Sequence, residues 1–377
     1  MLFIQAELPR WVRPNNNHSM SKMRTAIIGL GLVVEQIHLP ACGAVPNLEL
    51  VAGCDPRPER RSWAEKQGVP VTYTDAATLL GREKPELVLI ATPPDSHREL
   101  CLLALQHGAH VLCEKPFITS LEEADDVVVA AEQAGRNVVV NNQYRYLDTY
   151  LKTKRALDRG DFGRPYLIQA WQQMYHPPQH EDNWRSRLTQ STLYEFGSHP
   201  LDLFSYLFGA LPQTISAHIP KVRQDIEADV LVQATMRYPG ERLATLMMNR
   251  VSRAPWRYLE MRVDCEEASL RLSFGGVARA TMEWSREAGR PVFRASFVKG
   301  GEARIERDGR SRLLACDKRE GRPMATARVL AEMIGDIQAG RISLDAVNHA
   351  RALARTIFAG YESARCGETI NIANFMP

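Results

Sequence analysis

Short apolar runs alternate with helical patterns over the first third of this 377-residue chain, and this alternation constrains the fold more than any other feature. The runs are rich in β-branched residues and apolar on both faces, which is typical of buried parallel strands. They are 25–28, 48–54, 87–91, 110–113 and 137–140. Between the third and fourth runs, Leu100, Leu103 and Ala104 form one helical stripe that ends at Gly108. Repeated βα units of this kind predict a doubly wound parallel sheet.

The pattern of apolar residues changes after about residue 160. Longer strand-like runs with turn residues between them follow there, and they predict a mostly antiparallel sheet. These runs are 165–171, 230–238, 244–250, 258–263, 269–274 and 280–284, and helical stretches follow at 325–339 and 344–364. We therefore predict an α/β chain with a doubly wound domain at 23–145 and an α+β domain at 146–377, whose last helices pack back on the first domain. Residues 1–22, which include Asn15, Asn16 and Asn17, are predicted to be a flexible extension.

Composition narrows the functional classes. A formal net charge of +3 is too small to indicate nucleic acid or an anionic membrane as a partner, and no run of eighteen apolar residues could span a membrane. The seven cysteines are scattered without a Cys-x-x-Cys pair, which favours reduced thiols in the cytoplasm. The segment 176–182 contains His176, His180 and two acidic residues, but its prolines prevent a helix that would align the histidines, so no metal site is predicted.

A glycine turn stands where the first strand should become a helix. Gly29 and Gly31, with Leu32 and Val33 next, would permit a tight turn and let backbone N–H groups approach a pyrophosphate. The third small residue of the G-x-G-x-x-G/A pattern is replaced by Val34, which we expect to move helix and strand apart or to require smaller neighbours.

An acidic residue follows the second predicted strand at the expected distance. Asp55 lies 24 residues after Gly31, where a carboxylate binds the ribose hydroxyls of a dinucleotide. Because Asp55 would repel a 2′-phosphate, NAD is the predicted cofactor. Arg57 stands close enough to offset that repulsion, so NADP is the second candidate.

Three segments together resemble the Gfo/Idh/MocA family of oxidoreductases: the glycine turn, Thr92-Pro-Pro-Asp-Ser-His97, and the run 109–116 that ends in Glu114-Lys115-Pro116. The likeness runs from about Met23 to the end of the chain. It implies a Rossmann domain for NAD or NADP, a sheet domain that covers the nicotinamide, and hydride transfer at a carbinol or carbonyl of a sugar, polyol or sugar derivative. The implied cofactor contacts are Gly29, Gly31, Leu32, Val33, Asp55, Arg57, Thr92, Pro93, Pro94, His97, Glu114, Lys115 and Gln143.

A later segment resembles the family motif Asp-x-Gly-x-His-x-x-Asp. Here it reads Glu195-Phe-Gly-Ser-His199-Pro-Leu-Asp202, with Glu195 in place of the first aspartate, and 190–193 replaces a glycine-rich run. The resemblance implies that His199 transfers the proton, that Lys115 lies beside nicotinamide and substrate, and that Asp202 belongs to the same site. The residues expected to line the substrate side are Lys115, Arg145, Trp184, Arg185, Glu195 and His199.

The residues themselves suit alcohol oxidation, which needs a proton acceptor and a positive charge that stabilises the developing alkoxide. His199 has an ordinary pKa near ~6.5, and we expect it at the start of a helix whose positive end keeps the ring neutral. Lys115 can supply the charge, and Lys115-Pro116 is a candidate cis bond. Two assignments stay open: His199 as base with Lys115 anchoring the oxygen, or Lys115 as base with His199 orienting the substrate. Asp202 either orients His199 or only caps the helix.

Three functions remain open from the sequence. The first is a dehydrogenase or ketoreductase for a sugar-like molecule, and the second is a glycoside-cleaving enzyme that oxidises transiently and recycles its NAD. The third is an NAD-binding regulator without catalysis, against which the presence of both Lys115 and His199 argues. The resemblance also implies a homodimer or homotetramer paired through the sheet domain.

Overall fold

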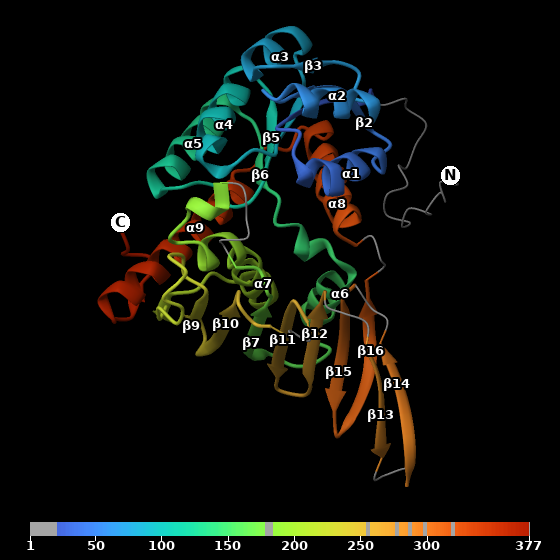
Figure 1. The fold of residues 1–377 in the computed structure, drawn as a ribbon, viewed down its shortest axis with the longest axis vertical. Helices are drawn as coiled ribbons and strands as arrows, with labels where there is room; N and C mark the ends of the chain where they lie inside the picture. The colour runs from blue at the N-terminus through green and yellow to red at the C-terminus, as the bar shows by residue number, and fades with distance from the viewer. Residues whose placement is uncertain are drawn as a thin grey trace.

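The computed structural model describes residues 21–177, 184–253, 257–275, 279–285, 289–296, 300–317 and 321–376. These residues form two large sheets, one above the other in Figure 1, with helices between and around them. The predicted extension at 1–22 lies outside the described residues except for its last two positions.

The upper sheet is the predicted doubly wound one. Its six strands are all parallel and lie in the order β3-β2-β1-β4-β5-β6. The strands are β1 Met23–Ile28, β2 Leu48–Cys54, β3 Thr72–Tyr73, β4 Leu87–Ile90, β5 His110–Cys113 and β6 Val138–Val140. All five predicted strands are confirmed. The added strand β3 has two residues, too few to carry a period.

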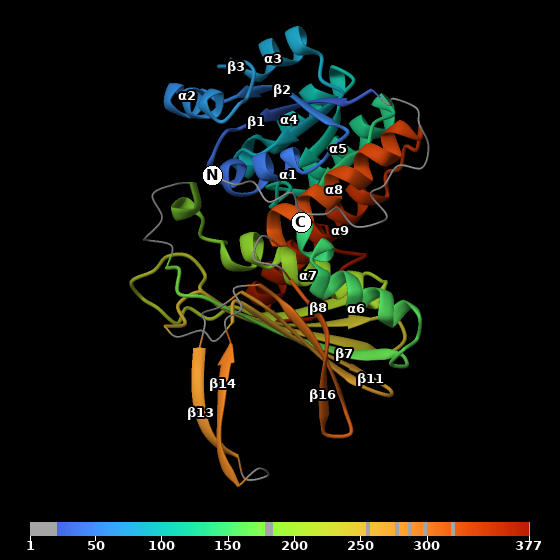
Figure 2. The same ribbon diagram turned by 90° about the vertical axis from the view of Figure 1, so that its right-hand side faces the viewer.

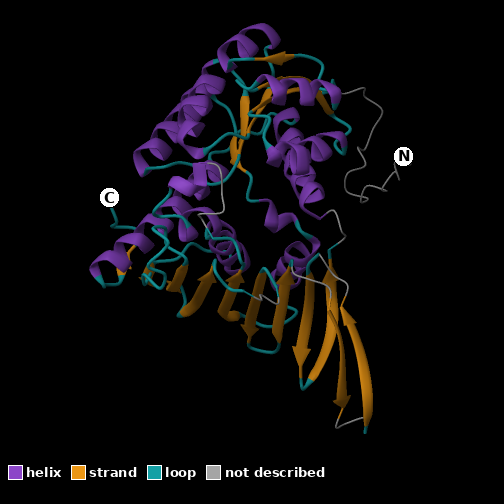
Figure 3. Cartoon of the chain, in the orientation of Figure 1, coloured by secondary structure: helices purple, strands orange, loops and turns teal. Residues whose placement is uncertain are grey.

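Helices flank the upper sheet on both faces (Figure 3). They are α1 Leu39–Gly43, α2 Pro58–Lys66, α3 Ala76–Glu83, α4 His97–Gln106 and α5 Leu121–Ala134. Both faces of the sheet are therefore covered, which is the physical reason that its strands read as continuous apolar runs.

The lower sheet has nine strands in the order β16-β15-β12-β11-β7-β10-β9-β8-β17. They are β7 Pro165–Gln173, β8 Thr214–His218, β9 Leu231–Tyr238, β10 Arg242–Asn249, β11 Leu259–Cys265, β12 Ser269–Phe274, β15 Glu302–Arg307, β16 Arg310–Cys316 and β17 Ile370–Asn371. Of its eight pairings, the one between β7 and β10 is parallel and the others are antiparallel, so the predicted mostly antiparallel sheet is confirmed.

A separate hairpin leaves the lower sheet and contains the run 280–284, which we predicted as part of that sheet. Its strands, β13 Arg279–Ser285 and β14 Arg290–Ser296, pair with each other as a two-stranded sheet that extends away from the nine strands (Figure 2).

One face of the lower sheet packs against the helices α6 Asp148–Asp158 and α7 Ser198–Phe208. Ile168 and Ala170 of β7 share a buried core with Leu157 of α6 and Phe204 of α7. Because side chains alternate along a strand, Trp171 of β7 lies on the opposite face, where it is 38% exposed.

The last two helices, α8 Gly321–Gln338 and α9 Asp345–Cys366, connect the two sheets. Leu330 of α8 packs in the core on one face of the upper sheet, and Val347 of α9 packs in the core on the other face. Further along α9, Ile357 enters the core of the lower sheet. Each such buried aliphatic side chain contributes about 1.5–3 kcal/mol to folding, so these helices fix the two sheets relative to each other.

The turn after β1 shows why glycine is needed at position 29. Gly29 has φ of +87°, and a Cβ there would lie 2.6 Å from the backbone oxygen of Ala91. Val34, which replaces the small residue of the pattern, is fully buried. The chain accommodates it in a π-helix, Val34–His38, that runs into α1.

Candidate active site

The predicted cofactor residues meet at one edge of the upper sheet. They follow the carboxyl ends of β1, β2, β4, β5 and β6, and parallel strands bring those ends together. The strand order reverses between β1 and β4, and such a switch point is where open α/β sheets bind ligands. A Cβ added at Gly31 would meet no atom within 4 Å, and Leu32 is 63% exposed. The backbone of this turn is therefore accessible to a pyrophosphate, and the edge fits a dinucleotide.

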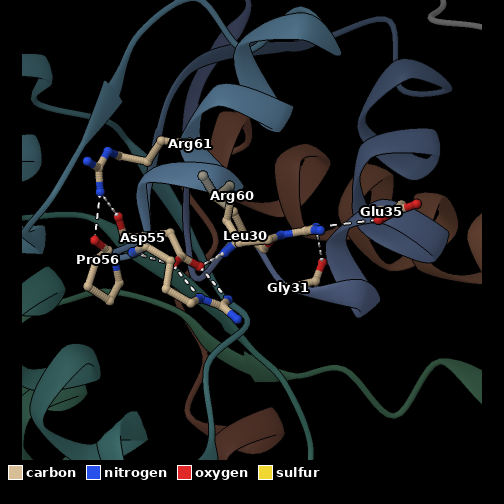
Figure 4. Close-up of polar contacts among 8 residues, drawn as sticks. Leu30, Gly31, Glu35, Asp55, Pro56, Arg60 and Arg61 are labelled. Atoms are coloured by element: carbon tan, nitrogen blue, oxygen red, sulfur yellow. Dashed lines mark hydrogen bonds and ion pairs between the residues drawn. The ribbon is translucent and has the colours of Figure 1, made fainter.

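Asp55 follows β2, and its carboxylate is already engaged at both oxygens (Figure 4). Leu30 N and Arg57 Nη2 each donate to Oδ2 at 2.9 Å. Arg57 N and Nε donate to Oδ1 at 3.0 and 2.9 Å. Burial alone would raise the pKa of Asp55, but these hydrogen bonds from Arg57 and Leu30 outweigh it and lower the pKa. The structure thus links the Asp55 carboxylate tightly to the neighbouring Arg57 guanidinium.

Two more arginines surround this position. Arg61 Nη1 donates to the backbone oxygens of Asp55 and Pro56, both at 2.8 Å, and Arg60 Nη2 donates to the backbone oxygen of Gly31 at 3.3 Å (Figure 4). Three guanidinium groups, those of Arg57, Arg60 and Arg61, thus lie around this turn with two carboxylates, because Arg60 Nη2 also contacts Glu35 Oε2 at 3.4 Å. The repulsion that Asp55 would exert on a 2′-phosphate is therefore largely compensated here.

His97, at the start of α4, is fully buried and holds two loops of the site together. Its Nδ1 lies 3.0 Å from the backbone oxygen of Phe117, and its Nε2 lies 2.9 Å from that of Thr92. Burial lowers the pKa of His97 against the opposing effect of these contacts. With both ring nitrogens engaged by backbone, His97 supports the loops after β4 and β5 and has no nitrogen directed at the cofactor.

Glu114 is buried next to Lys115 in a hydrogen-bond network that the sequence analysis did not predict. Its Oε1 accepts a hydrogen bond from Asn141 Nδ2 at 2.7 Å and lies 2.8 Å from His38 Nε2, and its Oε2 accepts from Lys115 N at 3.2 Å. Burial would raise the pKa of Glu114, but the contacts with His38 and Asn141 and the charge of Lys115 bring it down to about 2. Glu114 is therefore a fixed negative charge beside the reacting edge.

Lys115 follows β5, and its bond to Pro116 is cis, as predicted. Its Nζ donates to the backbone oxygen of Glu195 at 3.4 Å and lies 5.7 Å from the centre of the Phe196 ring. Burial lowers the pKa of Lys115, with the charges of Glu195 and Glu114 opposing. The ammonium group thus connects the upper sheet to the segment that leads into α7.

His199 lies in the first turn of α7 and is 4% exposed. Its ring stacks on that of Tyr144, with 3.8 Å between the ring centres and an angle of 5° between the planes. Its Nδ1 is buried, and no described residue forms a hydrogen bond with it. The pKa of His199 is lowered to about 3, first by burial and then by the positive charge of Lys115, so the ring is neutral at physiological pH.

The predicted neutral ring has a different cause from the one we expected. The residues before α7 form a π-helix, Thr192–Phe196, and Gly197 continues it with helical φ and ψ of −70° and −22°. The N–H groups at the start of this helical segment are those of Ser191, Thr192 and Leu193, which donate to the Asp229 carboxylate. Burial and Lys115, rather than a free helix end, therefore keep His199 neutral.

Glu195, which replaces the family aspartate, reaches Arg185. Its Oε1 accepts a hydrogen bond from Arg185 Nε, and its Oε2 is buried without a partner among the described residues. Arg185 belongs to a short 3-10 helix, Trp184–Arg187, and its guanidinium lies 4.6 Å from the centre of the Trp184 ring. The longer side chain thus fastens this segment beside Lys115, a contact that the sequence left undefined.

In the run 190–193, which replaces the glycine-rich run, Gln190 is exposed whereas the three residues after it are buried. Ser191 and Thr192 are fully buried. Ser191 Oγ accepts a hydrogen bond from Arg250 Nη1 at 2.5 Å, and Thr192 Oγ1 donates to the backbone oxygen of Asp229 at 2.5 Å. The side chains of Ser191 and Thr192 are thus tied into the core by Arg250 and by the backbone of Asp229.

Asp202 and Arg145, both predicted at the site, bind each other. Arg145 Nε donates to Asp202 Oδ2 at 2.5 Å, and Asp202 Oδ1 lies 2.9 Å from His349 Nε2 on α9. Asp202 is buried, and among the described contacts its carboxylate has none with the His199 ring. Asp202 therefore anchors α7 to α9 and to the segment after β6.

The comparisons with known proteins decide the family. The model of an oxidoreductase family with an NAD-binding Rossmann fold matches residues 23–142, and the GFO/IDH/MocA C-terminal domain matches 150–271. A D-apiose dehydrogenase from Paraburkholderia graminis is 30% identical over 261 residues, 68% of each chain. The protein belongs to the Gfo/Idh/MocA family. It is thus an oxidoreductase, and its first domain is an NAD-binding Rossmann domain.

Other Gfo/Idh/MocA proteins resemble shorter parts or the fold alone. A D-glucoside 3-dehydrogenase from Escherichia coli is 34% identical over 152 residues, which is 40% of this chain and 43% of that protein. An oxidoreductase from Agrobacterium radiobacter, solved with NAD+, L-tartaric acid and magnesium, superposes with a TM-score of 0.76. It is 21% identical and covers 94% of this chain and 100% of its own.

No metal-binding group of three or more His, Cys, Asp or Glu occurs among the described residues of this Gfo/Idh/MocA protein. His176 is described, and its backbone N donates to Arg250 O at 2.8 Å, whereas His180 and the two acidic residues after it lie outside the described part. No helix in that part is long and apolar enough to cross a membrane.

Proposed function

We propose that the protein is a dehydrogenase that oxidises a CH–OH group of a sugar, polyol or sugar derivative with NAD or NADP, and that Lys115 and His199 handle the proton. The observation that carries this proposal is the contact that brings the two residues together. Lys115 Nζ, from the upper sheet, donates to the backbone oxygen of Glu195 at 3.4 Å, four residues before the buried His199 of α7. Its positive charge adds to the effect of burial in lowering the pKa of His199. A cation and a neutral imidazole brought together at a dinucleotide-binding edge are the two groups that alcohol oxidation requires.

The cofactor supplies the hydride acceptor when it is bound. The residues that would hold it are the turn from Gly29 to Val33, Asp55 with Arg57, the loop Thr92–Pro94, and the segment from Glu114 to Lys115. Gln143 is buried after β6, with an unpartnered Oε1 among the described residues, and would face the same edge. His97 would act indirectly, by supporting two of these loops.

In the proposed mechanism, Lys115 donates a hydrogen bond to the reacting oxygen and stabilises its negative charge as it develops. His199, held neutral by burial and by Lys115, accepts the hydroxyl proton. In the reduction direction the same pair acts in reverse, and the proton that His199 accepted in oxidation would return to the carbonyl oxygen. The lowered pKa of Lys115 supports the second assignment, in which a neutral Lys115 takes the proton and His199 positions the oxygen.

Arg185, Glu195 and Trp184 are proposed to form the substrate wall. The contact between Arg185 and Glu195 fastens the short 3-10 helix next to Lys115, and Trp184 gives it an aromatic surface of the kind on which sugar rings pack. Arg145, because it is paired with Asp202, would shape this region through α7 rather than bind the substrate directly.

The test is a screen of aldoses, glycosides and cyclic polyols with NAD and with NADP, followed by absorbance at the reduced nicotinamide band. D-Apiose and glucosides are the first compounds to try, because two relatives are named for acting on them. Accumulation of NADH in step with a keto product supports the proposal. Release of an aglycone without net NADH would instead show an oxidation–elimination enzyme. No turnover of any substrate, despite tight NAD binding, would indicate a regulator.

We also propose a cytoplasmic homodimer or homotetramer. All seven cysteines are free, five of them buried, as expected of a reducing compartment. On the face of the lower sheet opposite α6 and α7, Trp171 and Leu243 are 38% and 37% exposed, which is a natural surface for pairing two sheets. Light scattering coupled to size exclusion gives the number of subunits directly, and a monomeric mass would refute the assembly.

A further inference from the structure

We propose that Tyr144 is the positioning residue of His199: its ring sets the plane of the imidazole, so that the reacting nitrogen faces the substrate. This inference rests on the proposed proton-transfer role of His199. Tyr144 lies in a 3-10 helix, Gln143–Tyr146, directly after β6, between two residues that the sequence motifs had pointed to.

The ring of His199 lacks the usual means of orientation. A catalytic histidine is commonly held by a hydrogen bond from its second nitrogen to a carboxylate or carbonyl group. Here Nδ1 is buried without a hydrogen-bonding partner among the described residues, and Asp202, the carboxylate three positions later, is engaged with Arg145 and His349. Packing must therefore set the orientation of the imidazole.

The stacking contact with Tyr144 is close enough to do so. The ring centres are 3.8 Å apart, the planes deviate by 5°, and both side chains are at most 5% exposed. A parallel neighbour at van der Waals distance prevents the imidazole from tilting toward it, while rotation within the plane stays limited by the surrounding core. The contact thus fixes the plane of the ring.

Tyr144 is itself held from the lower sheet. Its hydroxyl is hydrogen-bonded to that of Tyr258, which accepts a hydrogen bond from Gln172 Nε2 of β7 at 2.7 Å. Phe274, at the end of β12, packs at 4.9 Å between ring centres with the planes at 58°. Tyr144, which follows the upper sheet, is therefore held by Tyr258 and Phe274 from the lower sheet, and Gln172 supports Tyr258. The position of His199 thus depends on how the two sheets pack together.

Tyr144 has the properties of a positioning residue and not of an acid or base. Burial raises the pKa of its hydroxyl to about 12, with the charge of Arg322 and the hydrogen bond from Tyr258 opposing. The phenol is thus neutral at any working pH, and its oxygen is already engaged. Its ring face is the part that contacts the proposed catalytic group.

The first test needs no Tyr144 variant. In the histidine NMR spectrum of the whole protein, the ring protons of His199, assigned by their absence in His199→Asn, should be shifted upfield by the ring current of Tyr144. The exposed residues His107 and His218 give the reference positions. An unshifted His199 signal would show that the stack does not persist in solution and would overturn the inference.

The second test compares Tyr144→Leu with Tyr144→Phe. The leucine variant loses the flat ring, and we expect kcat to fall about 10- to 100-fold, because small displacements of a catalytic group have effects of this size. KM and the Kd for NAD should change little. Phenylalanine keeps the stack and loses only the bond to Tyr258, so kcat should stay within about threefold of the unaltered protein.

The same measurements in the His199→Asn background separate the two proposals. If His199→Asn keeps full turnover, the proposed function is wrong and the inference falls with it. If His199→Asn collapses turnover while Tyr144→Leu stays within threefold, the function stands and the inference is overturned. If both variants are slow, Tyr144→Leu must add no further loss to His199→Asn, because a positioning residue cannot act on a ring that is absent. If Tyr144→Leu lowered kcat by the same factor with His199 present and with His199→Asn, the positioning role of Tyr144 would be contradicted.

Discussion

Lys115 Nζ lies 3.4 Å from the backbone oxygen of Glu195, 80 positions further along the chain. This contact joins the edge of the upper sheet to the π-helix that runs into α7, and it brings the lysine to the segment that carries His199 four residues later. The proposed pair is therefore assembled from two parts of the molecule. Each prediction below tests one contact around it.

His199→Asn should lower kcat by about 10²- to 10⁴-fold, the usual contribution of a general acid or base. The Kd for NAD, measured by calorimetry, should stay near its original value, because His199 is not among the residues proposed to hold the cofactor. His218→Asn is the matched control, because His218 is exposed on β8. Equal turnover in the two variants would remove His199 from the mechanism.

Replacing Lys115 by Met should raise the pKa of His199. Its folded-state value of about 3 is due first to burial and then to the charge of Lys115, so removing that charge moves it part of the way toward 6.5. Glu114 and Asp202 already favour the charged ring, and Arg322 opposes it. An NMR titration checks this: the unaltered His199 should not titrate between pH 5 and 8, whereas the variant should begin to protonate as pH falls. Lys66→Met, at the exposed end of α2, should change nothing.

The pH profile of the unaltered enzyme separates the two bases. If His199 accepts the proton, kcat/KM for oxidation should have no acid limb from this group above about pH 5, because the ring is neutral well above its pKa of about 3. If Lys115 accepts it, the rate should rise with pH up to the lowered pKa of the lysine. The rate of the chemical step across pH 5–10, isolated with deuterated substrate, gives the answer.

Shortening Glu195 to Asp should break its contact with Arg185 and loosen the 3-10 helix that holds Trp184. We expect KM for the sugar-like substrate to rise about tenfold, the effect of losing a charge-assisted hydrogen bond, with a smaller change in kcat. Arg185→Ala should give a similar rise, and the double variant should be no worse than either. Arg187→Ala, on the same helix but exposed, is the control. A fall in kcat at constant KM would instead place Glu195 in the chemical step.

The ratio of kcat/KM for NADP to that for NAD should respond oppositely to Asp55 and Arg57. Asp55→Ala leaves the arginines to bind a 2′-phosphate, so the ratio should rise about tenfold or more. Arg57→Ala frees the carboxylate to accept hydrogen bonds from the ribose hydroxyls and to repel the phosphate, so the ratio should fall. Arg82→Ala on α3 should leave it unchanged. Changes of the same sign in both variants would refute the proposed balance.

Glu114→Gln should alter how stability depends on pH. The carboxyl pKa is about 2 in the folded protein against an ordinary 4.5, so its contribution is complete above pH 4.5 and is lost as pH falls toward 2. Linkage sets this contribution at about 3 kcal/mol at most. The glutamine variant should be less stable at pH 7 and should lose less stability between pH 5 and 3 in urea unfolding. Glu59→Gln, exposed on α2, should keep the original slope.

Much of the fold was readable from local patterns. The strand β2 matches its predicted bounds, and α7 ends where Gly209 adopts a left-handed φ of +64°. The two-residue strands β3 and β17 were missed because they show no period, and the longer strands β8, β14, β15 and β16 were missed as well. The sequence also pointed to Lys115 and His199. It did not point to Tyr144, although both neighbours, Gln143 and Arg145, were predicted site residues. It gave no sign that His38 pairs with Glu114.

The sequence by itself determined the alternation of elements, the dinucleotide turn and the residue types at the site, because period, turn chemistry and motif spacing are properties of neighbouring residues. The tertiary structure alone decided the partners of those residues. Asp202 binds Arg145, 57 positions earlier, and His349, 147 positions later, and the neutral state of His199 follows from its burial and from Lys115. Desolvation and charge–charge interaction depend on distance in space, which is set only when the two sheets and the closing helices pack together.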